Sequence, residues 1–239
     1  MIVVDIGNTN LTFAWFKKGK LTRVVKLDTA TISKSAIERV LSKEKNEKIL
    51  ICSVVPKITK IFRKLKTKVY VVGSEVKVPI VCLYDKRKVG MDRLVGAFSA
   101  QMLFPRVRFI LDFGTAITLD FLSKAQAYQG GIILPGIGST QKALSNCALL
   151  PREIKFKETK KIIPKTTKES ISKGLQEGFS LMINGLVKKY KKKLKIKPRE
   201  QIVITGGEAL VVLPKLNFTY EYERYLVLKG LEILSRNLS

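Results

Sequence analysis

The chain has 239 residues, of which 46% are hydrophobic and 27% are charged, and its formal net charge is +26. This composition excludes a disordered chain, and the length allows one or two domains. The sequence contains no histidine, which excludes Ser-His-Asp catalysis and His-ligated metal sites, and no apolar run is long enough to span a bilayer.

The first part of the chain predicts three strands, a helix, a strand, a helix and a further strand. The stretch "FKKGK" supplies a glycine-containing turn between the second and third strands. Helical spacing of Ala36, Ile37, Val40 and Leu41 favours the first helix, and Pro56 fits the first turn of the second. The expected ranges are strands 2–5, 10–16, 21–27, 48–55 and 69–72, and helices 33–45 and 56–67.

The second part predicts the same kinds of element in a similar order. A helix beginning near Gly90 precedes "VRFILDFGTAITLDFL", which is typical of a strand, a turn and a second strand. A short helix is expected after "TGG". The expected ranges are strands within 107–122, 127–136 and 201–207, helices 89–103, 138–149, 167–193 and 226–238, and an exposed lysine-rich stretch over 152–165.

The two parts carry the same short motif after their first strand. "IVVDIGNTN" (2–10) and "FILDFGTAIT" (109–118) both read as an apolar run, an aspartate, an apolar residue, a glycine and then small polar residues. A repeated motif within a repeated β/α pattern indicates a duplicated architecture. The sequence therefore predicts an α/β protein of two related domains, over 1–106 and 107–239, each with a mixed sheet flanked by helices.

The chemistry of a D-x-G turn suits phosphate binding. Glycine lets a ligand approach the backbone closely, and the exposed N–H groups and the Asn and Thr side chains are donors to phosphate oxygens. A nearby carboxylate, Asp5, is a suitable partner for the Mg²⁺ that phosphates carry. The alternative for either motif alone is a plain hairpin turn, but the pair favours a nucleotide site.

The strong positive charge has two interpretations, a polyanion partner or a lysine-rich solvated surface, and we favour the second. The densest run, "KKYKKKLKIK" (188–197), falls at the end of a predicted helix, where lysines suit the helix dipole without a ligand. Nucleic acid is therefore not an expected partner. Cys52, Cys82 and Cys147 are expected to be ordinary buried thiols. Asp5 interrupts any secretory leader, so we expect a cytoplasmic protein without a membrane partner.

Paired D-x-G turns resemble those of the acetate and sugar kinase, Hsp70 and actin superfamily, whose duplicated ribonuclease-H-like domains bind ATP. The resemblance becomes specific for type III pantothenate kinases and spans nearly the whole chain. The segments that carry it are "DIGNTN" (5–10), "SVVP" (53–56), "VGMDR" (89–93), "DFGTAIT" (112–118), "GGIILPG" (130–136) and "TGGEA" (205–209).

The resemblance implies ATP-dependent phosphorylation of pantothenate to 4'-phosphopantothenate, the first step toward coenzyme A. It implies that Asp92 is the catalytic base, that Asp5 places Mg²⁺, and that Asp112 binds a monovalent cation, K⁺ or NH₄⁺. The residues implied to bind ATP are Asp5, Ile6, Gly7, Asn8, Thr9, Asn10, Leu11, Thr12 and Thr115. ATP would lie between the two D-x-G turns.

The resemblance also implies the acceptor site and a homodimer that shares its active site across the interface. The implied pantothenate contacts are Tyr84, Gly90, Met91, Asp92, Arg93 and Thr167, the last reaching the substrate from the partner subunit. Structural alternatives remain open: helix capping for Asp92 and for Thr166 or Thr167, an ion pair with Asp92 for Arg93, and a turn-forming role for Asp112. The apolar stripe of helix 167–193 is either dimer interface or core.

Three departures from the family pattern stand out. The segment "YDKRKVGMDR" lacks the Asn-Pro that the family usually carries after the tyrosine, Met91 replaces the usual alanine, and Thr166 stands where asparagine is common. Two other functions remain as alternatives. One is another small-molecule kinase of the same superfamily, which "GMDR" disfavours. The other is a non-catalytic regulator associated with nucleic acid, which the intact Asp5, Asp92 and Asp112 disfavour.

Overall fold

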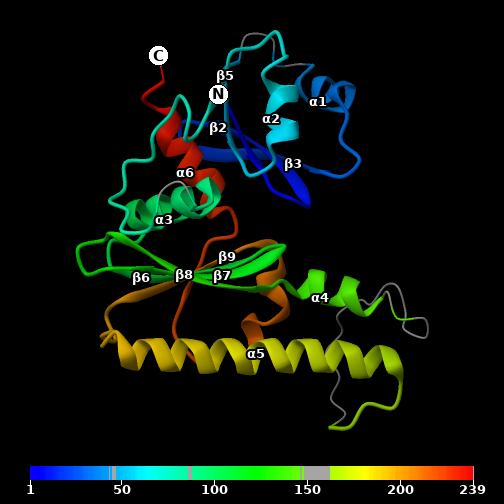
Figure 1. Ribbon diagram of the computed structural model, residues 1–239, viewed down its shortest axis with the longest axis vertical. Coiled ribbons are helices and arrows are strands. Elements are labelled where there is room, and N and C mark those ends of the chain that lie inside the picture. Colours follow the sequence, from blue (N-terminus) through cyan, green and yellow to red (C-terminus); the bar gives the residue numbers. More distant parts are fainter. Residues whose placement is uncertain (43, 45–46, 86–87, 146, 148–161, 239) are drawn as a thin grey trace. The chain divides into compact units, whose positions relative to one another are not determined.

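The computed structural model describes residues 1–42, 44, 47–85, 88–145, 147 and 162–238. The chain divides into two compact units (Figure 1). The first consists of Met1–Pro105, Leu122–Gly130 and Tyr225–Ser239, and the second of Arg106–Phe121 and Gly131–Arg224. These units are not continuous in sequence, and the domain boundary expected after residue 106 stays a prediction.

The first unit is built on a five-stranded mixed sheet in the order β3-β2-β1-β4-β5. The central strand β1 pairs antiparallel with β2 and parallel with β4, so all five predicted strands are confirmed. Their bounds are β1 Ile2–Ile6, β2 Asn10–Lys17, β3 Lys20–Asp28, β4 Ile49–Ser53 and β5 Val69–Val71.

Helices cover both faces of this sheet. Alternate residues of β1 point to opposite faces, so Ile2, Val4 and Ile6 join one apolar cluster and Val3 joins another. The first cluster lies under α1 (Lys34–Leu41) and α2 (Pro56–Phe62), and the second under α3 (Met91–Leu103) and α6 (Leu226–Ser235) (Figure 1). The face that carries Val3 is therefore the α3 face.

Two helices of the first unit end earlier than the apolar spacing predicts. The helix expected over 33–45 ends at Leu41, where the Ser42 hydroxyl donates to the carbonyl of Arg39, 2.9 Å away, and so satisfies a helix-terminal oxygen. The helix expected over 56–67 ends at Phe62, where the N–H groups of Lys64 and Leu65 donate three residues back, to the carbonyls of Ile61 and Phe62, and close tighter turns.

The second unit has a five-stranded sheet in the order β10-β9-β6-β7-β8. Its central strand β6 pairs antiparallel with β7 and parallel with β9, as β1 does with β2 and β4. Read in the opposite direction, this is the order of the first sheet, which confirms the predicted duplication. The bounds are β6 Val107–Phe113, β7 Ala116–Leu122, β8 Tyr128–Pro135, β9 Gln201–Thr205 and β10 Glu221–Tyr222.

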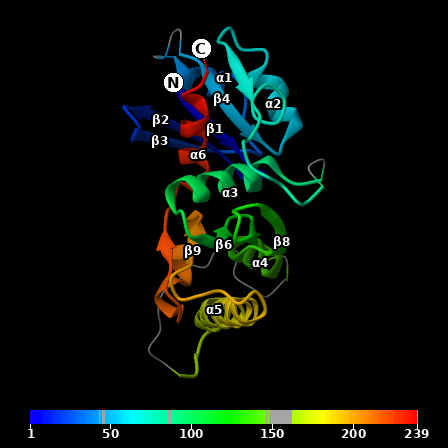
Figure 2. The ribbon, with the colours of Figure 1, turned by 90° about the vertical axis from the view of Figure 1, so that its left-hand side faces the viewer.

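The long helix α5 (Thr167–Lys193) lies along one face of the second sheet (Figure 2). Its residues Leu175, Phe179, Ile183 and Val187, four apart, are buried in the apolar cluster that β6, β7 and β9 also form. The stripe whose role the sequence left open is therefore core. Among the described residues, no helix is both long and apolar enough to cross a membrane.

Several smaller expectations need correction. The segment after "TGG" forms 3₁₀ turns, η1 (Gly207–Val211) and η2 (Leu213–Lys215), and not an α-helix. Helix α4 spans Ile137–Leu144, while 148–149 of the expected helix and most of the lysine-rich stretch 152–165 lie outside the described residues. Of the three free cysteines only Cys52 is buried, since Cys82 is partly exposed and Cys147 is exposed.

Candidate functional site

The first D-x-G turn joins β1 to β2, and Thr29 makes two hydrogen bonds to it. The Thr29 hydroxyl donates to the carbonyl of Gly7, 2.8 Å away, and its backbone N–H donates to the carbonyl of Thr9 at 2.9 Å. Asn8 and Thr9 are exposed at the tip. Ile6 and Leu11 are buried in the core, so at these two predicted ATP positions only the backbone is available to a ligand.

Asp5 lies on the α3 face of the first sheet because it alternates with Val4 and Ile6, which point the other way. Its direct neighbour on β4 is Cys52, which is buried in the apolar cluster under α3. Its neighbour on β2 is Thr12. Strand register therefore brings an aspartate, a threonine and a thiol into one row across the sheet.

The Cys52 thiol lies within the electrostatic influence of both Asp5 and Asp92. Burial raises its pKa well above the usual value, and the negative charges of Asp5 and Asp92 raise it further. Both carboxylates therefore act on the same sulfur, although one belongs to β1 and the other to the first turn of α3. From the sequence, Cys52 was expected only to be a buried thiol. Its place beside Asp5 depends on the parallel pairing of β1 with β4.

Asp92 is the second residue of α3, after the N-cap Gly90 and Met91. Its Oδ1 accepts a hydrogen bond from the backbone N–H of Arg93 at 2.8 Å. A side chain at Gly90 would collide with this carboxylate, and one at Gly73 would come within 2.8 Å of the Met91 sulfur. Asp92 thus accepts one N–H of the first helical turn, but it is not the N-cap, which is Gly90 without a side-chain cap bond.

An aromatic cluster lies beside Arg93 in the first unit. The guanidinium carbon of Arg93 is 5.9 Å from the ring centre of Tyr128, a cation–π geometry. Tyr84 meets Tyr128 edge-on, with ring centres 6.5 Å apart. Gly130 has φ +105°, and a Cβ there would lie 2.8 Å from the Tyr84 ring. The structure therefore brings Tyr84 and Arg93 to the same cluster, around a tyrosine that the sequence analysis had not singled out.

The second D-x-G turn joins β6 to β7 and is one residue shorter than the first, since the Gly114 N–H donates to the carbonyl of Ala116 at 3.1 Å whereas that of Gly7 donates to Asn10 at 3.0 Å. Asp112 is paired with Thr118 on β7 and Thr205 on β9, as Asp5 is with Thr12 and Cys52. Thr115 is exposed at the tip. The two aspartates are thus equivalent positions in the two sheets, with a threonine opposite each on the antiparallel neighbour.

Two more segments pack against this second turn. The carbonyl of Thr115 accepts the N–H of Gly136 at 3.1 Å and the hydroxyl of Ser139 at 2.6 Å, so the start of α4 is fixed to the turn. Gly206, at φ +92°, lies against Asp112, where a Cβ would come 2.7 Å from Oδ1. The sequence analysis gave Gly136 and Ser139 no functional role. Their link to Thr115 depends on tertiary packing.

The glycine-containing segment "GIGSTQK" (136–142) forms the start of α4, and its first turn is hydrogen-bonded to a carboxylate of the protein. The N–H of Gly138, in the first turn of α4, donates to Oε2 of Glu208 at 3.1 Å. A carboxylate of the protein itself therefore occupies this helix N-terminus.

Thr167, the remaining predicted substrate contact, is at the start of α5. It is the first residue of α5 and is exposed, while the N-cap is Thr166, whose hydroxyl accepts the N–H of Glu169 at 3.3 Å. Of the two capping candidates, Thr166 is the one used. The predicted substrate contact of Thr167, which requires a partner subunit, stays a prediction.

Within the described residues, no group of three or more His, Cys, Asp or Glu side chains is arranged to hold a metal ion. A single carboxylate at each turn nevertheless fits the way Mg²⁺ binds to nucleotides, through one or two carboxylates and the phosphate oxygens. Asp5 is the carboxylate predicted for Mg²⁺, while Asp112 is predicted to bind a monovalent cation.

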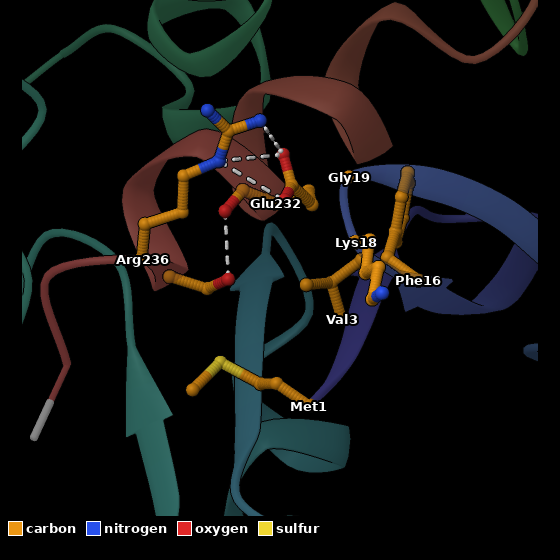
Figure 3. Close-up of a pocket in the computed structure, with 8 residues that line it drawn as sticks. Met1, Val3, Phe16, Lys18, Gly19, Glu232 and Arg236 are labelled. Carbon is orange, nitrogen blue, oxygen red and sulfur yellow. Dashed lines mark hydrogen bonds and ion pairs between the residues drawn. The ribbon is translucent and has the colours of Figure 1, made fainter.

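A pocket of about 480 Å³ lies elsewhere in the first unit (Figure 3). The lower ends of β1 and β2 form one wall and α6 the other, and the ion pair between Glu232 and Arg236 lies at its rim. None of the predicted site residues lines it. This pocket is therefore separate from the candidate site residues.

Sequence comparison gives a consistent result. A family model described as type III pantothenate kinase matches residues 1–189. A type III pantothenate kinase of Methylacidiphilum infernorum is 33% identical over 241 residues, covering 100% of this chain and 89% of the relative. Another from Persephonella marina is 34% identical, covering 95% of both chains.

Solved structures share the architecture at low sequence identity. A Baf family protein of Campylobacter jejuni is similar with a TM-score of 0.64 and 21% identity, covering 99% of this chain and 98% of that one. Component A of the (R)-2-hydroxyglutaryl-CoA dehydratase of Acidaminococcus fermentans gives a TM-score of 0.53 at 12% identity, with coverage of 96% and 93%. The fold is thus the duplicated ribonuclease-H-like, actin-like ATPase fold.

Proposed function

The chain belongs to the type III pantothenate kinase family and phosphorylates pantothenate with ATP, the first step of coenzyme A biosynthesis, and we propose that Asp92 is its general base. It is therefore a phosphotransferase with an alcohol acceptor. The observation that carries the assignment of Asp92 is its place in the first turn of α3, the helix that covers the face of the first sheet on which Asp5 lies. One carboxylate would serve the acceptor and the other the metal-bound phosphates.

In this mechanism the Asp92 carboxylate accepts the proton of the pantothenate hydroxyl as its oxygen attacks the γ-phosphorus of ATP. Phosphoryl transfer depends mainly on positioning and charge neutralisation, so a carboxylate suffices as the base in a chain without histidine. The bond between Oδ1 and the Arg93 N–H fixes the direction of the carboxylate. The carboxylate is thereby oriented before the acceptor arrives.

The turn from Asp5 to Thr12 binds the ATP phosphates in this proposal. Its exposed residues Asn8 and Thr9 and its backbone N–H groups are the donors, and the hydrogen bonds from Thr29 hold the turn in shape. Asp5 would hold Mg²⁺, whose other ligands would include phosphate oxygens. When bound, Mg²⁺ neutralises the charge that develops on the phosphates during transfer.

The second D-x-G turn contributes a monovalent cation site and a further ATP contact. Asp112 would bind K⁺ or NH₄⁺, and the exposed Thr115 would contact the nucleotide. The support is the equivalence of Asp112 with Asp5 in the two sheets and the glycine turns packed around it. Oxygen ligands from a carboxylate and from turn carbonyls suit such hard cations.

Pantothenate itself is proposed to contact Tyr84, Arg93 and the N-terminus of α3 at Gly90 and Met91. Arg93 can pair with the substrate carboxylate, and Tyr84 lies in the same aromatic cluster through Tyr128. The missing Asn-Pro before Gly90 does not separate Tyr84 from this cluster.

A homodimer would complete the site, with Thr167 at the exposed start of α5 reaching pantothenate in the partner's site. A cytoplasmic location follows from the use of ATP and accords with three free cysteines. Neither another small-molecule kinase nor a nucleic-acid regulator is favoured by the comparisons.

The test is ADP release by the purified protein with Mg-ATP, with and without pantothenate, in potassium or sodium salts. Turnover that needs pantothenate and potassium is expected. The Asp92→Asn variant should lose turnover while keeping its circular dichroism spectrum and its affinity for ATP. Near-wild-type turnover in this variant would remove the assignment of the base, and loss of ATP binding would assign Asp92 to the nucleotide instead.

A further inference from the structure

Glu208 and Gly138 form a contact within the second unit that joins two glycine-containing turns. The Gly138 N–H donates to Oε2 of Glu208 at 3.1 Å, across 70 residues of sequence. A Cβ on Gly138 would lie 2.5 Å from Oε1 of the same carboxylate. The glycine therefore leaves the space in which the carboxylate lies, and any side chain at position 138 would displace it.

The segment that carries Gly138 and the segment that carries Glu208 both also contact the Asp112–Thr115 turn. On the α4 side, Gly136 and Ser139 both donate to the carbonyl of Thr115. On the η1 side, Gly206 lies against Asp112, and its carbonyl accepts the hydroxyl of Tyr222 at 3.3 Å. The contact between Glu208 and Gly138 thus closes a ring of three segments, 112–115, 136–139 and 206–208.

The carboxylate is electrostatically suited to this position. It points at the first turn of α4, where the unsatisfied N–H groups carry a partial positive charge that stabilises an anion. A hydrogen bond with a charged acceptor is stronger than a neutral one. The helix therefore offsets the negative charge of Glu208, which would otherwise oppose the approach of a triphosphate.

We propose that Glu208 is a positioning residue for ATP binding, which holds the Gly206–Gly207 turn and the Thr115 turn in one preformed arrangement. This proposal rests on the proposed contact of the Thr115 turn with the nucleotide. Turns that are already ordered in the folded protein lose little conformational entropy when a ligand binds, so preorganisation should raise the affinity for ATP. Pantothenate, proposed to contact the first unit, should be affected little.

The experiment measures the Kd of Mg-ATP by calorimetry without pantothenate, and then both KM values. The variants are Glu208→Ala, Gly138→Ala, the double variant and Glu208→Gln, which keeps an acceptor oxygen. Glu221→Ala, at an exposed position of β10, is the control for the loss of one negative charge. Alanine is favoured over glycine in a helix, so Gly138→Ala is not expected to unfold α4.

We expect each single alanine variant to weaken ATP binding about threefold to tenfold, the usual effect of losing one charged hydrogen bond at a partly exposed site. The double variant should be no weaker than the weaker single variant, because both remove the same contact. Glu208→Gln should bind ATP with an affinity between those of the wild type and Glu208→Ala, because it keeps the hydrogen bond but loses the charge. Glu221→Ala should bind ATP within about twofold of the wild type, and the KM for pantothenate should change by less than about twofold throughout.

Additive effects of the two alanine substitutions, an unchanged Kd in both, or an equal rise in the two KM values would overturn the proposal. Because the Kd is measured without pantothenate, this result does not depend on which acceptor is phosphorylated. Failure of the proposed function shows separately, as wild-type ATP binding without pantothenate-dependent ADP release.

Discussion

The Asp92 carboxylate lies directly against Gly90, in the space that a Cβ atom at that position would need. Gly90 is the N-cap of α3 and has φ −63° and ψ 136°, a conformation that every residue adopts. Glycine is therefore required there by the carboxylate and not by the backbone. Position 90 controls where the proposed base points.

Replacing Gly90 by alanine should push the Asp92 carboxylate out of place and lower kcat about tenfold to hundredfold, because small misplacements of reacting groups cost that much. The KM for ATP should stay close to the wild-type value. Steady-state kinetics of Gly90→Ala checks this, and the same substitution in an Asp92→Asn background should have no further effect. An unchanged kcat in the single variant would show that the carboxylate tolerates displacement.

Gly73 and Met91 should behave as a size-matched pair. Gly73 has φ +88°, and a Cβ there would lie 2.8 Å from the Met91 sulfur. We expect Gly73→Ala to destabilise the protein by about 1–3 kcal/mol through backbone strain and overpacking. Met91→Ala should relieve the overpacking, so the cost of Gly73→Ala should be smaller in that background. Urea unfolding of the four proteins measures this, and equal costs in both backgrounds would contradict it.

Alanine substitutions at Thr166 and Thr167 should have different effects, the first on stability and the second on activity. Thr166 caps α5, so Thr166→Ala should lower the free energy of unfolding by about 1 kcal/mol with little effect on kinetics. Thr167→Ala removes no cap and should leave stability unchanged, while raising the KM for pantothenate if Thr167 reaches the substrate of a partner subunit. Denaturation and kinetics on the two matched variants decide this, and the reverse pattern would disprove the assignment.

The Cys52 thiol should make stability depend on pH in the alkaline range. Burial and the charges of Asp5 and Asp92 raise its pKa in the folded state, whereas the unfolded thiol ionises near its usual pKa of about 8.5. Above that pH the unfolded state binds fewer protons than the folded state, so stability falls as pH rises. The contribution is fully present below the unfolded pKa.

The comparison is between wild type and Cys52→Ala. The difference in their free energies of unfolding should change by up to about 1.4 kcal/mol per pH unit above pH 8.5, in the direction that disfavours the wild type. The other two cysteines are common to both proteins and cancel. A difference that does not vary with pH would mean that Cys52 ionises normally in the folded protein.

Much of the fold was predictable from local pattern. Apolar runs bounded by turns located β1 and β6, and the shared D-x-G motif correctly predicted that Asp5 and Asp112 take equivalent places in duplicated sheets. These features depend on residues adjacent in sequence, because apolar runs of strand length and glycine turns can be recognised from the local sequence alone.

The remaining features depend on tertiary packing. The sequence does not reveal that Cys52 lies beside Asp5, because strand pairing joins residues 47 apart. The contact between Glu208 and Gly138 spans a still longer separation. The early ends of α1 and α2 also escaped prediction, since helix termini depend on competing local hydrogen bonds and on burial.

The position of α6 in the first unit has a consequence for how the protein is made. α3, which carries Asp92, packs against α6 so closely that Gly230 lies against Val95 and Ser99. During synthesis, domains usually fold in the order in which they leave the ribosome. Here the first unit must wait until residues 226–235 have emerged, after the whole of the second unit. A nascent chain stalled before that point would contain every proposed catalytic residue. It would lack α6, the helix that packs against α3 and so helps to position Asp92.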